Sequence, residues 1–212
     1  DADLAWARSD APAARRAHER AVALSAHGND EGHGAAAELG RAQLALAMGD
    51  DEGALPALER AELLALGSGR ARVAALARVT LGEIALRRGA VEAAREDVAL
   101  AAAHARALPE RVGRVLLVAA EVELALGCGA RAAELAGVAR GAMRPVDAVG
   151  HAVSLAIEAV ARAARSPSEG RALGAEATAM ARGLGAVETA IVLSWLGAAR
   201  GGEAATALDV LS

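Results

Sequence analysis

Apolar and polar residues recur along the chain with the spacing of amphipathic helices. In one stretch Leu58, Ala61, Leu64 and Ala65 follow one another at intervals that place them on one helical face, which a single polar residue, Glu62, interrupts. Val and Ile are scattered, and no stretch alternates with the period of two that a half-buried strand requires. The pattern therefore predicts an all-α fold.

The same pattern returns after forty residues. A displacement of that length aligns the segments 3–21, 43–61, 83–101 and 123–141. One column of this alignment holds bulky apolar residues, namely Leu4, Leu44, Ile84 and Leu124. Another column holds the expected turn residues, namely Ser9, Gly49, Gly89 and Gly129. Two degenerate units follow at slightly shorter spacing. The repeat predicts about six helical pairs that stack on one another.

Each unit is expected to hold two helices joined by a glycine turn, because Gly accepts the left-handed conformation that often ends a helix. Asp50 follows Gly49 directly and is expected to cap the next helix. The Gly- and Asp-rich segment 27–34 is expected to be a loop between units. We expect one domain over residues 1–212, without an internal boundary, and interpret it as a segment of a larger protein.

Two of the units resemble the tetratricopeptide repeat. The family pattern begins with Leu-Gly, Ala and a turn Gly, and continues with Ala, a bulky residue and Ala. One unit matches it in order with Leu81, Gly82, Ala85, Gly89, Ala94, Val98 and Ala101. The unit from Ala42 to Ala61 matches it as well. The repeat is longer than the family's usual length of about 34 residues, and Ala and Leu replace its large aromatic residues. Repeats of this alanine-rich type are similar to the arms of large ATP-dependent LuxR-type bacterial transcriptional regulators. The resemblance implies a TPR-like α-α superhelix.

In tetratricopeptide-like arrays the first helix of each pair lines a concave groove, so the resemblance makes this groove the expected binding surface. The candidate groove residues are Gln43, Leu46, Val79, Glu83, Arg87, Leu116 and Glu123. One column of the alignment contains Gln43, Glu83 and Glu123. This column either forms a partly acidic row that selects a cationic or hydrogen-bonding ligand, or is an ordinary solvated helix face. The arginines of the same helices either pair with these carboxylates, contact an anionic group or form plain surface ion pairs; they are Arg78, Arg87, Arg111 and Arg114.

Composition and charge exclude several functions. The net charge of −4 gives no basic field for a nucleic-acid backbone, and a chain without Phe or Tyr lacks most of the groups on which single-stranded bases stack. The single cysteine, Cys128, excludes an internal disulfide and fits a reducing, cytoplasmic compartment. No apolar run approaches the length of about 20 residues that spans a bilayer. We therefore expect no nucleic-acid or membrane partner.

The chain shows no motif for catalysis or for phosphate binding. It contains no P-loop, no nucleophile elbow and no His-Glu-x-x-His pattern. His27 and His33 flank Asp30 and Glu31, and a metal site in this segment is the alternative to a plain polar loop. We interpret the segment as a loop, and expect neither a metal, a cofactor nor an enzymatic activity.

The leading hypothesis is a non-enzymatic module that binds a protein segment or a small effector in the groove, as the sensing arm of a bacterial transcriptional regulator. The alternative is a stand-alone adaptor scaffold for protein assembly. A third reading, an enzyme on a helical-repeat frame, requires a cluster of acids, His or metal ligands at one rim, and the sequence offers no such set. Apolar ends of an open array leave room for a homo-oligomer joined through them. The sequence names neither ligand nor partner.

Overall fold

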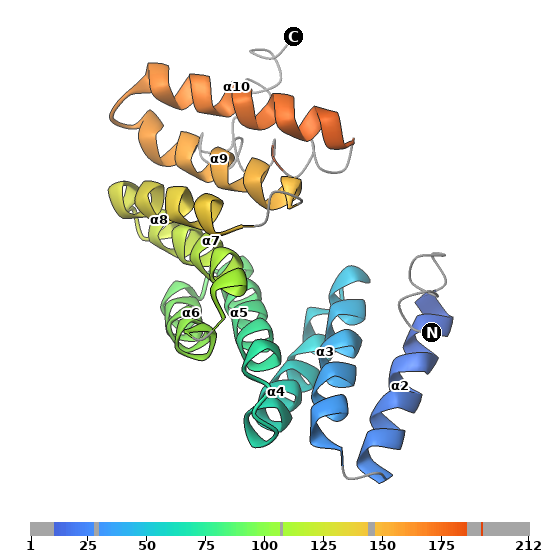
Figure 1. Cartoon of the computed structure of the whole chain (residues 1–212). Helices are drawn as coiled ribbons and strands as arrows, with labels where there is room; N and C mark the ends of the chain where they lie inside the picture. Colours follow the sequence, from blue (N-terminus) through green and yellow to red (C-terminus); the bar gives the residue numbers. More distant parts are fainter. Residues whose placement is uncertain (1–10, 28–29, 107, 144–146, 186–191, 193–212) are drawn as a thin grey trace. The chain divides into compact units, whose positions relative to one another are not determined.

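The regular elements of the chain are helices (Figure 1). The computed structural model describes residues 11–27, 30–106, 108–143, 147–185 and 192. The helices are α2 (Ala11–His27), α3 (Glu31–Ala47), α4 (Asp51–Gly67), α5 (Ala71–Arg87), α6 (Val91–Ala105), α7 (Pro109–Ala125), α8 (Gly129–Ala142), α9 (Ala148–Ala163) and α10 (Pro167–Leu184). Because these residues contain no strand, the prediction of an all-α fold is confirmed for this part of the chain. The helices expected before residue 10 and around Gly201 lie outside it.

Glycine turns separate several successive helices. The φ angles of 77°, 69°, 74° and 76° lie in the left-handed region, which strains other residues, and belong to Gly49, Gly69, Gly89 and Gly127. The turns predicted at Gly49 and Gly89 are therefore confirmed. The turn predicted at Gly129 is wrong, since Gly129 is the first residue of α8. A Cβ at Gly129 would lie 3.1 Å from the carbonyl oxygen of Ala161, so this glycine permits close packing instead of a turn.

Aspartate side chains cap the N-termini of three helices in the described residues. The carboxylate of Asp50 accepts a hydrogen bond of 2.8 Å from the backbone N–H of Gly53, which confirms the predicted cap. Asp30 caps α3 and Asp147 caps α9 in the same way, each through a bond of 3.0 Å. Such a cap satisfies one of the N–H groups that the first turn of a helix leaves without a partner.

The loop expected over 27–34 is shorter than predicted. The cap at Asp30 starts α3 at Glu31, so Gly32 and Gly34 lie inside a helix and are buried. A Cβ at Gly34 would stand 3.1 Å from Ser25 Oγ and 3.3 Å from Leu64 Cδ1. Gly32 and Gly34 therefore leave room for side chains from neighbouring segments, a role that composition alone does not separate from that of a loop.

Neighbouring helices pack against each other in the order of the chain. In the compact unit that ends at Ala107, each helix from α2 to α6 packs on the next, and in the unit that begins at Leu108, α7 to α10 do the same. Within these units the backbones of α3 and α5 also meet, as do those of α7 and α9. The backbones of α2 and α4, of α4 and α6, and of α8 and α10 do not approach each other in the described residues. We call α3, α5, α7 and α9 the first-type helices, and the even-numbered helices the second-type helices.

Alanine dominates the core of both units. Most of the buried apolar side chains in the described residues are Ala. In the first unit they surround Leu58 and Ile84, and in the second they surround Ile157, which are among the largest side chains without solvent contact. The distance between packed helices depends on the side chains at the contact, so an alanine core brings the backbones close together.

Gly170 allows α9 and α10 to approach each other closely. A Cβ at Gly170 would lie 2.7 Å from the Cβ of Ala163 and 2.9 Å from the carbonyl oxygen of Ala159, whereas a Cβ at Gly137 of α8 would meet nothing within 4 Å.

We expect Gly170→Ala to lower the free energy of unfolding by about 1–3 kcal/mol, because the methyl group forces α9 and α10 apart. The matched control Gly137→Ala is expected to raise it by up to about 1 kcal/mol, since Ala is the better helix former and the site is open. Urea unfolding followed by circular dichroism measures both changes. Equal stabilisation by the two variants contradicts the close contact.

Candidate functional site

Five of the predicted groove residues lie on the first-type helices of the first unit, and four of them are at least partly exposed. Gln43 on α3 is exposed and Glu83 on α5 is half-buried, and each stands four residues before the last residue of its helix. Leu46 is half-buried and Arg87 exposed, one turn further along α3 and α5. Because α3 and α5 are in direct contact, the structure brings these residues onto adjacent helices.

Val79 differs from the other candidates in its burial. Its relative accessibility is 0%, so its side chain packs inside the first unit and offers no surface to a ligand. Leu39, forty residues earlier, is also buried. The position therefore belongs to the packed face of the first-type helices.

Arg87 has a partner within the chain. Its Nη2 lies 2.9 Å from Asp51 Oδ1, and the adjacent Arg88 forms a similar pair of 2.7 Å with Glu52. These exposed ion pairs connect the end of α5 to the beginning of α4. Of the roles that the sequence left open for Arg87, a surface ion pair is therefore the one that the structure shows.

Leu116 and Glu123 belong to α7 of the second unit, where both are half-buried. Since α7 ends at Ala125, the residue that stands four positions before the end of this helix is Glu121. Glu121, and not Glu123, therefore corresponds to Gln43 and Glu83 when positions are counted from the helix ends. The shift has the same origin as the turn at Gly127, which comes two residues earlier than a strict period of forty places it.

The first unit contains an ionic network that connects three helices. Glu62 of α4 has a side chain only 8% exposed, and its carboxylate binds the guanidinium of Arg78 of α5, with Nε at 2.8 Å from Oε1 and Nη2 on Oε2. Arg78 also donates to Asp97 of α6 at 2.9 Å. The Nε2 of His104 lies 3.1 Å from Glu62 Oε1. Arg78 thus binds carboxylates of the neighbouring helices.

Burial and pairing act on Arg78 in opposite directions. Burial opposes its charged form, but the hydrogen bonds to Glu62 and Asp97 outweigh that effect and raise the pKa of Arg78. The arginine therefore stays charged and neutralises the buried Glu62. The sequence signal for this network was Glu62 itself, the polar interruption on an apolar face.

We expect Arg78→Gln to lower the free energy of unfolding by about 2 kcal/mol, because it leaves Glu62 buried with less compensation. Arg87→Gln, on the same helix, removes an exposed pair and is expected to cost less than about 1 kcal/mol. Chemical denaturation of both variants tests the difference. Equal losses in the two variants contradict a special role for the buried pair.

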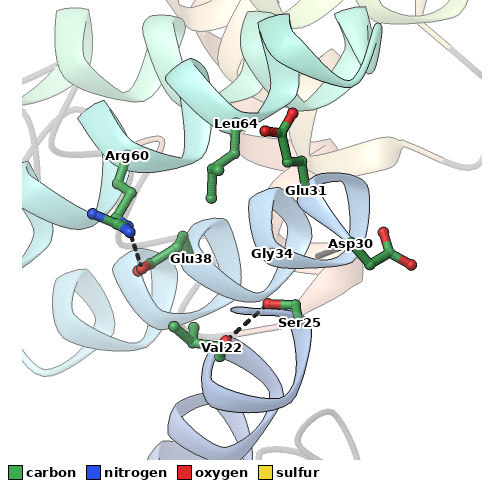
Figure 2. A pocket seen from close by; sticks show the side chains of 8 residues that line it. All are labelled: Val22, Ser25, Asp30, Glu31, Gly34, Glu38, Arg60 and Leu64. Atoms are coloured by element: carbon green, nitrogen blue, oxygen red, sulfur yellow. Dashed lines mark hydrogen bonds and ion pairs between the residues drawn. The ribbon is translucent and has the colours of Figure 1, made fainter. Parts of the chain in front are cut away.

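A pocket of about 250 Å³ opens in the first unit between α2, α3 and α4 (Figure 2). Three carboxylates and one arginine supply its charge, while a valine and a leucine supply its apolar wall; the lining residues are Val22, Ser25, Asp30, Glu31, Gly34, Glu38, Arg60 and Leu64. The sequence pattern did not indicate this pocket. Its one signal was Glu38, a charged residue among Ala35, Ala37 and Leu39 on the packed face of α3.

Asp30 is engaged at the edge of this pocket. Its Oδ1 accepts the capping bond from the N–H of His33, and its Oδ2 lies 2.6 Å from His33 Nδ1. The backbone bond first, and then the side-chain bond, hold the pKa of Asp30 below its usual range. No group of three His, Cys, Asp or Glu side chains in the described residues is arranged to hold a metal ion.

The lowered pKa of Asp30 predicts a pH dependence. A carboxyl group whose pKa is lower in the folded protein contributes stability above its unfolded pKa, and loses it as the pH falls through its folded pKa. We expect the difference in melting temperature between the wild type and Asp30→Ala to shrink between about pH 5 and about pH 2. Asp30→Asn keeps an uncharged cap and serves as the control. A difference that is constant over this range contradicts the prediction.

Comparison with known proteins adds no family assignment. No protein-family model matches the chain, and no curated protein matches its sequence. Within the part of the chain that the structure describes, no helix combines the length and the apolar character needed to cross a bilayer.

Proposed function

We propose that the chain is a non-enzymatic helical-repeat module that binds a protein segment or a small effector on the surface of its first-type helices. One observation carries the proposal: α3 and α5 contact each other and hold the exposed Gln43 and the half-buried Glu83 at the same position relative to their ends. A surface built from equivalent positions of successive helices is the surface that repeat proteins use for binding.

Helix boundaries support a repeat of about forty residues as part of this proposal. The helices α3 and α5 end at Ala47 and Arg87, forty positions apart, and α7 and α9 end at Ala125 and Ala163, a slightly shorter interval. This spacing fits the proposed TPR-like superhelix of stacked pairs. In the second unit the equivalent position is that of Glu121 on α7, and the predicted Leu116 and Glu123 lie on the same helix.

The biological setting follows from the resemblance to regulator arms and rests on analogy at the level of the fold. We favour the sensing arm of a bacterial transcriptional regulator, and keep a stand-alone adaptor scaffold as the second candidate. The nucleotide sequence on both sides of the segment distinguishes them. A P-loop domain upstream and a helix-turn-helix downstream support the regulator, while a reading frame little longer than these residues supports the adaptor.

The surface of α3 and α5 can be tested with peptides selected from a random display library against the whole chain. We expect Glu83→Arg to weaken binding of the selected peptides roughly tenfold, the equivalent of about 1.4 kcal/mol, because it reverses a charge on the proposed surface. Glu92→Arg changes an exposed residue of α6 and is the matched control. Calorimetric titration measures both affinities, and the helical circular dichroism spectrum is expected to stay unchanged.

Two results contradict this assignment of the surface. Selected peptides that bind Glu83→Arg as tightly as the wild type show that they bind elsewhere. Equal losses in Glu83→Arg and Glu92→Arg show that net charge, and not the surface of α3 and α5, controls binding.

A further inference from the structure

We draw no further inference here: the strongest candidate, the apolar surface patch that the exposed Leu63 and Leu66 form about one turn apart on α4, carries none because nothing in the structure shows what covers it.

Discussion

The close approach of helix backbones is the constraint on which the other features of both units depend. An alanine side chain buries little apolar surface, and hydrophobic stabilisation follows the area removed from water, at about 25 cal/mol per Å². A core built mainly from alanine therefore gains stability only if each helix packs along its length on neighbours. Between α9 and α10 the backbones come so close that only glycine fits at position 170, because a Cβ there would meet the backbone of α9.

Close packing also determines how the charged residues are arranged. Three buried glutamates lie on packed helix faces, with side chains no more than 8% exposed: Glu38, Glu62 and Glu158. Glu38 and Glu158 each contact two arginines, and Glu62 contacts Arg78 and the imidazole of His104. Glu158 of α9 meets Arg162 at 2.7 Å and Arg140 of α8 at 2.9 Å, although Arg140 Nη1 and Glu158 Oε2 are not aligned for a hydrogen bond. Arginine suits this role because its long stem spans the distance between helices and its guanidinium is always charged. In each case at least one arginine comes from a neighbouring helix, so the buried carboxylates help to specify which helices pack together.

Local sequence signals predicted the local structure well. The turns at Gly49 and Gly89 and the cap at Asp50 depend on backbone conformation and on bonds within one turn, which these residues determine by themselves. The sequence-based prediction failed where the role of a glycine depends on another helix. Gly129 and Gly34 are typical turn residues in a sequence, yet each lies inside a helix where atoms of another helix come close. The partners of Arg78 could not be predicted from the sequence either, because Glu62 and Asp97 lie on two other helices. A repeat of forty residues does not indicate which carboxylate faces which arginine.

The two sides of the first unit differ for a physical reason. The backbones of the first-type helices α3 and α5 meet, whereas those of the second-type helices α2 and α4 do not, so a space remains between α2 and α4 that side chains only partly fill. An alanine in place of Gly34 would narrow that space and would favour the helix by about 1 kcal/mol through propensity alone. Packing explains why glycine stands there, because a Cβ at this position would lie 3.1 Å from Ser25 Oγ and 3.3 Å from Leu64 Cδ1. The buried carboxylate of Glu38, which pairs with Arg41 and Arg60, lines the same space and keeps it polar on that side, so the space does not fill with additional apolar core.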